Sequence, residues 1–147
     1  MQRSARSLLV VEDDVTVARA LARSLARRGF SVSIVGSCKA ALALVQSFDF
    51  AILDLDLPDG NGVDLARQLL SAGTAPNVLF YTGSIHRALL ARARRVGPVV
   101  MKAGGLAPLI AYLTHDAADA PESRTAPSQK LATSSTPSAS LRKSRVR

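Results

Sequence analysis

The chain has 147 residues, of which 48% are hydrophobic, and a formal net charge of +8. This length supports one compact core and is too short for two domains of ordinary size. A single cysteine, Cys38, excludes an internal disulfide and a cysteine-based zinc site. The longest apolar stretch covers residues 40–45, too short to cross a membrane, and the N-terminal residues do not read as a cleavable signal. We therefore expect a soluble cytoplasmic protein.

The positive charge is unevenly distributed along the chain. Residues 1–116 carry 13 Lys/Arg against 9 Asp/Glu, whereas residues 117–147 carry 6 against 2. The second segment is rich in Ser, Thr and Pro and cannot bury enough apolar surface to offset the entropy lost on ordering. We predict a folded domain over residues 5–116 and a disordered, basic Ser/Pro-rich tail over residues 117–147. The charges of this tail are interpreted as solubilising rather than as a binding arm.

Short apolar runs alternate with helix-like stretches, which is the pattern of βα units around a parallel sheet. In chain order we predict a strand at 8–11, a helix through Val17, Leu21 and Leu25, a strand at 31–35, a helix through Ala40, Leu44 and Val45, a strand at 50–53, a helix through Leu65, Leu69 and Leu70, a strand at 78–81, a helix at 88–96, a strand at 99–101 and a helix at 106–113. Gly29 and Gly73 supply stops after the first and third helices. Several strands are almost continuously apolar, as expected where helices cover both faces of a sheet.

Four of the five predicted strands run into ionic or hydroxyl side chains: Glu12, Asp13 and Asp14 after the first, Asp54 after the third, Thr82 after the fourth and Lys102 after the fifth. Ligands of open parallel sheets bind beyond the carboxyl ends of the strands. If the strand order is 2-1-3-4-5, the first and third strands are neighbours, and carboxylates from both converge. Lys102 and a hard divalent cation, Mg²⁺ rather than Ca²⁺, can balance their charge. Such a set suits phosphoryl transfer.

The segments LLVVEDD, AILDLDLPDGNG, VLFYTG and VVMK together resemble the motif set of the bacterial response-regulator receiver family, over roughly residues 5–115. The resemblance implies a flavodoxin-like (βα)5 fold. It also implies an aspartate that accepts a phosphoryl group from a histidine kinase or a histidine phosphotransfer protein. Asp54, four positions before Pro58 and eight before Gly62, matches that acceptor.

The same resemblance implies a magnesium site and two further functional side chains. Glu12 and Asp13 match the acidic pair, with Asp13 as the direct ligand, and Asp56 matches the position that offers a backbone carbonyl to the metal, beside the Asp54 carboxylate. Thr82 and Lys102 match the residues that position and neutralise the phosphoryl group. The carboxylate of Asp56 is expected to tune phosphoryl lifetime.

Asp59 is interpreted separately, as an ordinary turn residue in a loop where glycine supplies a positive φ. His86 and His115 have no partner at metal-ligand spacing and are expected to be passive.

Two positions depart from the family pattern. Val99 stands where the family usually has Tyr or Phe, and a β-branched side chain cannot carry the swing of a ring. Ala103 stands where the family usually has a proline in a cis bond; a cis Lys102–Ala103 bond would cost about 2.5–4 kcal/mol, so either that strain is tolerated or the loop is rearranged. We expect the phosphoryl chemistry to be retained and the output coupling to differ.

After residue 113 only the tail follows, which predicts a stand-alone receiver: a signalling module, not an enzyme. Two outputs are expected. The chain docks on a partner protein through the fourth helix, fifth strand and fifth helix, where His86, Arg87, Arg92, Arg94 and Arg95 form a basic face, or it passes its phosphoryl group on in a relay. Two alternatives remain open. One is a pseudo-receiver interaction module that phosphorylation does not control. The other is a nucleic-acid-binding regulator using the basic tail, although no recognition motif or base-stacking aromatics support it.

Overall fold

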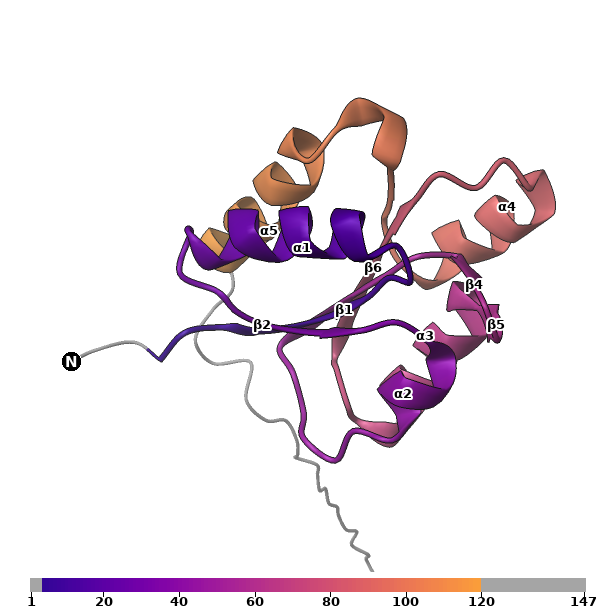
Figure 1. The fold of residues 1–147 in the computed structure, drawn as a ribbon, viewed down its shortest axis with the longest axis horizontal. Helices are drawn as coiled ribbons and strands as arrows, with labels where there is room; N and C mark the ends of the chain where they lie inside the picture. The colour runs from indigo at the N-terminus through magenta and orange to yellow at the C-terminus, as the bar shows by residue number, and fades with distance from the viewer. Residues whose placement is uncertain (1–3, 120–147) are drawn as a thin grey trace, which may run out of the picture. The chain divides into compact units, whose positions relative to one another are not determined.

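The computed structural model describes residues 4–119, which form an α/β arrangement (Figure 1). The elements are β1 (Ser7–Val11), α1 (Val15–Ala26), β2 (Ser31–Val35), α2 (Cys38–Leu42), β3 (Phe50–Leu53), β4 (Asp56–Leu57), β5 (Gly60–Asn61), α3 (Gly62–Ala72), β6 (Asn77–Thr82), α4 (Arg87–Val96), β7 (Val99–Met101), the 3-10 turn η1 (Lys102–Gly104) and α5 (Ala107–Asp119). Five strands form a parallel sheet in the order β2-β1-β3-β6-β7. The predicted fold class and strand order are confirmed.

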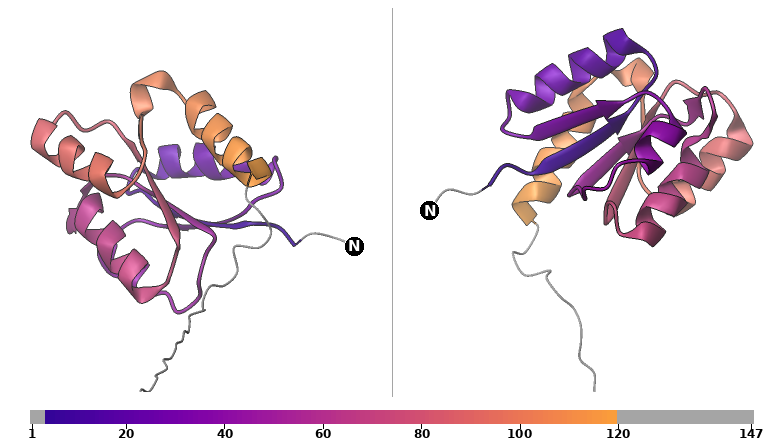
Figure 2. Two further views of the ribbon diagram at one scale, coloured as in Figure 1. Left: turned by 180° about the vertical axis from the view of Figure 1, so that it is seen from behind. Right: turned by 60° about the horizontal axis from the view of Figure 1, so that its bottom comes forward.

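Helices cover both faces of this sheet, which explains why its strands are apolar on both sides. Figures 1 and 2 show α1 and the first turns of α5 on one face, and α2, α3 and α4 on the other. On the second face, Leu9 and Leu53 from the strands pack with Val63 and Leu69 from α3 and Ala93 from α4. Each large apolar side chain buried in this way contributes roughly 1.5–3 kcal/mol. None of the helices within residues 4–119 is long and apolar enough to cross a membrane.

The ends of the helices follow local capping chemistry. Asp14 starts α1, because its Oδ1 accepts hydrogen bonds from the backbone N–H of Thr16 at 2.9 Å and of Val17 at 3.2 Å. Gly73, with φ +74°, ends α3 in the left-handed conformation that glycine adopts without steric cost. Gly29 also has a positive φ, of +90°, shortly after α1. The predicted stop at Gly73 is confirmed, whereas α1 already ends at Ala26 with Arg27 as its C-cap, before Gly29 is reached.

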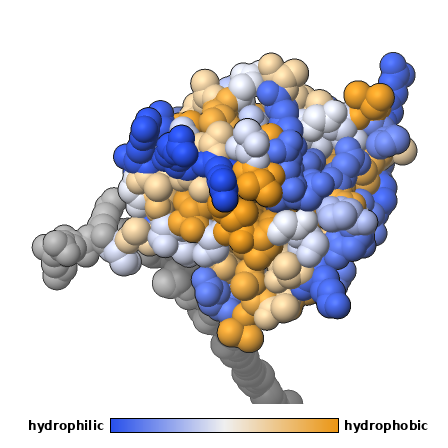
Figure 3. All heavy atoms as spheres, viewed as in Figure 1, coloured by the Kyte–Doolittle hydropathy of each residue, from blue (hydrophilic) through white to orange (hydrophobic). Residues whose placement is uncertain are grey.

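The second helix is much shorter than predicted. It ends at Leu42 with Ala43 as its C-cap, so Leu44 and Val45 lie beyond it, and Val45 is fully exposed. The helix ends early because the chain continues to Phe48, which is buried. The backbone N–H of Phe48 donates to the carbonyl of Thr74 at 2.7 Å. Because α2 ends early, Leu42 and Val45 are exposed to solvent. The face of the molecule drawn in Figure 3 carries hydrophobic areas between hydrophilic ones. The prediction that the helix includes Leu44 and Val45, which was based on their helical spacing, is therefore wrong.

The segment after Asp54 also differs from its prediction as a simple turn. β4 and β5 pair as a short antiparallel hairpin. Among residues 4–119 a positive φ occurs at Gly29, Gly73 and Gly105, so the glycines at 60 and 62 do not supply one, contrary to the prediction. Gly62 instead allows the first turn of α3 to lie close to the backbone of Asp54, because a Cβ at position 62 would lie 2.1 Å from the backbone oxygen of Asp54. The start of α3 can thus rest directly against the end of β3.

Two predictions near the C-terminus are refined by the structure. No cis peptide bond occurs in the described residues, so Lys102 and Ala103 are joined in trans and the chain continues as the turn η1. Helix α5 continues to Asp119, beyond the predicted helix end at 113. The remainder of the predicted tail lies outside the described residues.

Replacing Gly62 by alanine tests the close approach. Alanine normally stabilises a helix relative to glycine, but here its Cβ would overlap backbone that cannot move aside. We expect Gly62→Ala to lower the free energy of unfolding by about 1–3 kcal/mol in denaturant titrations. Gly36→Ala is the matched control, because its Cβ would meet nothing closer than 3.8 Å. Equal effects of the two substitutions would contradict the packing assignment.

Candidate functional site

Polar side chains from four strand ends meet at the carboxyl edge of the sheet. Glu12 follows β1, Asp54 follows β3, Thr82 ends β6 and Lys102 follows β7. The register accounts for two of these neighbourhoods. Val11 pairs with Leu53, so Glu12 and Asp54 follow level with each other, and Thr82 pairs with Met101, directly before Lys102. Glu12, Asp54 and Thr82 are all buried.

The carboxylate of Asp54 is held at both oxygens. Its Oδ1 accepts hydrogen bonds from Thr82 Oγ1 at 2.7 Å, from the backbone N–H of Leu55 at 2.7 Å and, more weakly, from that of Asp56 at 3.4 Å. Its Oδ2 accepts from Lys102 Nζ at 2.8 Å. The side chain is thereby fixed with 7% of its residue surface exposed, so it is buried and also reachable from the sheet edge.

Lys102 supplies the positive charge of this edge. Its Nζ lies 2.5 Å from Glu12 Oε1 and 2.8 Å from Asp54 Oδ2. Burial raises the pKa of Glu12, an effect that the hydrogen bond from Lys102 only partly offsets. Burial would lower the pKa of Lys102, but hydrogen bonds to Asp54 and Glu12 outweigh it and the pKa is raised. Lys102 therefore remains protonated and neutralises part of the acidic cluster.

The acidic cluster can also hold a cation. One carboxylate oxygen each from Glu12, Asp13 and Asp54 lie within 4.8 Å of one another. This oxygen-only set matches the preference of hard divalent cations, which bind few carboxylates and retain several waters. Asp13 is exposed, so the cluster opens to solvent on that side. Asp14 is excluded from the cluster by its role in capping α1.

Ser84 is a site residue that sequence reasoning missed. It is buried, and its backbone N–H donates to Thr82 Oγ1 at 3.1 Å. Its own Oγ accepts from the backbone N–H of His86 at 3.3 Å. The available signal was a hydroxyl residue two positions after Thr82, since Ser commonly bonds backbone N–H groups two residues further on.

Asp59 does no chemistry at this site and has a structural role instead. Its two carboxylate oxygens accept from the backbone N–H groups of Cys38 at 2.8 Å and Lys39 at 2.9 Å. Asp59 thus caps the first turn of α2 from a distant part of the chain. These backbone hydrogen bonds, that of Lys39 first, lower the pKa of Asp59.

One arginine of the predicted basic face points elsewhere. Arg92 forms an ion pair with Asp64 of α3, with Nη2 and Oδ1 2.7 Å apart. Hydrogen bonds from Asn61 and then from Arg92 lower the pKa of Asp64. The remaining basic side chains of that face, Arg87, Arg94 and Arg95, are exposed, as is His86.

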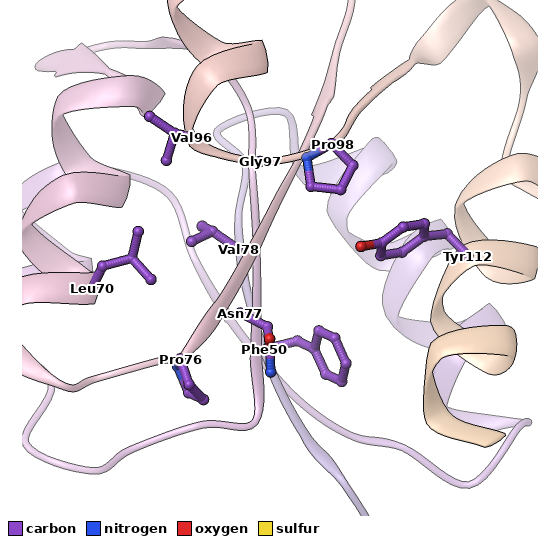
Figure 4. A pocket seen from close by; sticks show the side chains of 9 residues that line it. All are labelled: Phe50, Leu70, Pro76, Asn77, Val78, Val96, Gly97, Pro98 and Tyr112. Atoms are coloured by element: carbon purple, nitrogen blue, oxygen red, sulfur yellow. The ribbon is translucent and has the colours of Figure 1, made fainter. Parts of the chain in front are cut away.

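The cavity drawn in Figure 4 does not belong to this site. It has a volume of about 200 Å³ and lies at the other end of the strands, where Phe50 and Asn77 begin β3 and β6. Figure 4 shows Phe50, Val78 and Pro98 around it, with the Tyr112 ring from α5 beside them. No aspartate, glutamate, lysine, arginine or histidine lines it.

The fold and this site define an α/β domain whose sheet edge carries a carboxylate cluster, a lysine and a hydroxyl, a set typical of domains that handle phosphoryl groups. The model of the response regulator receiver domain matches residues 8–111, and the chain belongs to this family. Receiver domains act in two-component signalling, are typically phosphorylated by histidine kinases, and are signalling modules rather than enzymes.

Curated relatives are regulatory proteins. The chain is 37% identical over 82 residues to the photosynthetic apparatus regulatory protein RegA of Rhodobacter capsulatus, which covers 54% of this chain and 45% of RegA. It is 40% identical over 77 residues to the probable transcriptional regulatory protein SilR of Salmonella typhimurium, covering 51% of this chain and 34% of SilR. The chain thus spans less than half the length of these relatives.

Solved structures show the same fold. A CheY-like receiver domain protein from Methanospirillum hungatei matches with a TM-score of 0.70 and 22% identity, covering 77% of this chain and 94% of that chain. The response regulator TrrA of Thermotoga maritima, solved in complex with Mg(2+)-BeF, matches with a TM-score of 0.67 and 19% identity, covering 75% and 97%. The predicted flavodoxin-like fold is confirmed.

The thiol of Cys38 provides a pH-dependent test of the Asp59 cap. Burial, and then the nearby negative charge of Asp59, raise the pKa of Cys38 from 9.0 to about 11. Only the thiolate reacts with alkylating reagents, so at pH 9 native protein should react roughly 50-fold more slowly than protein unfolded in urea, and the rate should keep rising up to about pH 11.

Two variants separate the causes of this slow reaction. Asp59→Asn removes the nearby charge, so alkylation at pH 9 should accelerate. Asp56→Asn removes a carboxylate that is not among the causes of the raised Cys38 pKa, so it should leave the rate unchanged. Iodoacetamide labelling followed by intact mass measures both, since Cys38 is the only cysteine of the chain. An unchanged rate in Asp59→Asn would argue against the cap.

Proposed function

We propose that Asp54 accepts a phosphoryl group from a phosphohistidine of a histidine kinase or histidine phosphotransfer protein, in a magnesium-dependent step. The observation that carries this proposal is the environment of the Asp54 carboxylate. It is buried, yet both oxygens are engaged, one by the Thr82 hydroxyl and one by the Lys102 ammonium. Charge-complementary groups fixed around one acceptor are what phosphoryl transfer requires.

The transfer step follows from these contacts. An Asp54 oxygen attacks the phosphorus atom, a P–O bond forms, and the P–N bond to the donor imidazole breaks, leaving the electron pair on the ring nitrogen. Lys102 neutralises charge on the phosphoryl oxygens, and the Thr82 hydroxyl turns from Asp54 to one of them. Glu12, Asp13 and Asp54 would hold Mg²⁺, with the backbone carbonyl of Asp56. When bound, the ion supplies further charge neutralisation.

The output is proposed to be a protein contact. The face formed by α4, β7 and α5 exposes Arg87, Arg94 and Arg95, and Ile85 precedes α4 with 85% exposure. Basic groups around an apolar anchor suit a protein partner with an acidic rim.

The acceptor is tested with a small phosphodonor such as acetyl phosphate. With Mg²⁺ present, the wild-type chain should gain the mass of one phosphoryl group, and the gain should vanish with a chelator. Asp54→Asn should gain nothing. Asp56→Asn is the matched control, since it changes the carboxylate two positions away, and it should still be labelled with an altered lifetime. A folded wild-type chain that is never labelled would instead support the pseudo-receiver alternative.

The metal site is tested by stability in the absence of any phosphodonor. Lys102→Met leaves two buried carboxylates without their cation and should cost about 2–3 kcal/mol in a chelator, less than for a fully buried pair because Lys102 is 24% exposed. Mg²⁺ should restore more stability to Lys102→Met than to wild type.

Controls for the metal test are available on the chain. Lys39→Met removes an exposed lysine of α2, so it should change neither stability nor the response to Mg²⁺. Asp13→Asn should weaken the Mg²⁺ response sharply while leaving Lys102 in place. Melting temperatures at graded Mg²⁺ concentrations give the comparison, and identical Mg²⁺ responses in wild type and Asp13→Asn would contradict the proposed ligand set.

A further inference from the structure

Three hydrogen bonds in sequence connect Asp54 to the start of α4. Asp54 Oδ1 accepts from Thr82 Oγ1 at 2.7 Å, and Thr82 Oγ1 accepts from the backbone N–H of Ser84 at 3.1 Å. Ser84 Oγ then accepts from the backbone N–H of His86 at 3.3 Å. His86 is the N-cap of α4, so a polar connection of four residues joins Asp54 to the helix that carries the exposed arginines.

Ser84 is the central residue of this connection. It is 3% exposed, whereas Gly83, Ile85 and His86 on either side are exposed. A buried hydroxyl is unfavourable unless it is hydrogen-bonded, so its contact with His86 determines where it lies. The His86 side chain makes no capping hydrogen bond, and α4 has no acidic residue in its first turn. Ser84 thus supplies the side-chain acceptor at this helix start, where backbone N–H groups lack partners.

The direction of the Thr82 proton makes the connection sensitive to Asp54. A hydroxyl donates one proton and accepts on its lone pairs. Here the proton goes to Asp54 and a lone pair faces the N–H of Ser84. When the hydroxyl turns toward a phosphoryl oxygen, that lone pair turns with it, so Ser84 must follow or lose its contact. Because the N–H and Oγ belong to one residue, the displacement passes on to His86.

The neighbouring strand offers no equivalent route. Val99 of β7 pairs in register with Phe80, two residues before Thr82. Its β-branched side chain has one strongly preferred rotamer and little freedom to follow a movement at Thr82. The residue level with Thr82 is Met101, whose side chain is partly exposed.

We propose that Ser84 is a positioning residue that couples the Thr82 hydroxyl to the first turn of α4, so that loading of Asp54 displaces Ile85 and the start of that helix. The proposal rests on the proposed function of Asp54 as acceptor. Ile85 is a large apolar side chain with 85% exposure, so its displacement changes the apolar surface offered to a partner.

The experiment compares backbone amide chemical shifts by NMR, with and without beryllofluoride and Mg²⁺ as a phosphoryl mimic. In wild type, shifts should extend from Thr82 through His86 to Leu90. In Ser84→Ala, shifts at residues 86–90 should be roughly threefold smaller, because one member of a cooperative series is lost. Ser84→Thr, which keeps the hydroxyl, should restore them.

Ser37→Ala is the matched control. Ser37 Oγ caps α2 by accepting from the N–H of Ala40 at 3.1 Å, also near the carboxyl edge of the sheet, but it does not contact Thr82. Removal of the Ser37 hydroxyl should leave the chemical-shift changes at residues 86–90 unchanged. This result would distinguish a specific coupling through Ser84 from general destabilisation of the domain. Should Ser84→Ala fail to unfold cooperatively, Ser84→Cys provides the comparison, since sulfur is a weak acceptor and should give an intermediate response.

Intact mass after acetyl phosphate treatment is read on the same samples. Labelled wild type with an undiminished α4 response in Ser84→Ala overturns the coupling and leaves the acceptor assignment standing. An equal loss of response in Ser37→Ala also overturns the coupling. Absence of labelling in wild type overturns the proposed function itself.

Discussion

The ammonium of Lys102 holds two buried carboxylates at one sheet edge, and the other features of that edge depend on it. The side chains of Glu12 and Asp54 are only 4% and 8% exposed, so both charges would be strongly unfavourable without a counter-charge. The net stabilisation is modest, because desolvation of three charged groups offsets most of their attraction. The main effect is geometric: β1 and β3 end level with each other, whereas β7 continues two residues beyond the level of Leu53, and the long side chain of Lys102 meets both carboxylates from there.

Backbone N–H groups also hold the Asp54 carboxylate in place, in addition to the ion pair with Lys102. Leu55 and Asp56 present N–H groups to Asp54 only because the chain turns tightly after β3. That turn brings Gly62 against the Asp54 carbonyl, and the N–H of Gly62 donates to the carbonyl of Leu55 at 2.9 Å. Donors fixed before reaction need no reorganisation when charge develops. Since these donors are backbone groups, they place few demands on the side chains at positions 55 and 56.

Local sequence patterns predicted the sheet and most of the site, because a strand in a parallel sheet is a short apolar run and its polar neighbours must lie at the edge. The errors occurred where distant residues decide the outcome. The carboxylate that caps α2 comes from Asp59, 21 positions beyond Cys38. The length of α2 depends on the chain reaching Phe48, whose N–H pairs with the carbonyl of Thr74. Ser84 carried no periodic signal, since its role depends on burial of a single loop hydroxyl.

The two ends of α4 are attached in different ways, which determines how that helix can move. At its C-terminal end, Gly97 lies so close to β6 that a Cβ would come within 2.5 Å of the carbonyl oxygen of Val78. In its middle, Ala93 is fully buried, while the Arg92–Asp64 pair is about half exposed and adds little. At its N-terminal end, the only side-chain hydrogen bond among the described residues is that from His86 N–H to Ser84. The displacement proposed for Ser84 would therefore tilt α4 about its packed C-terminal end.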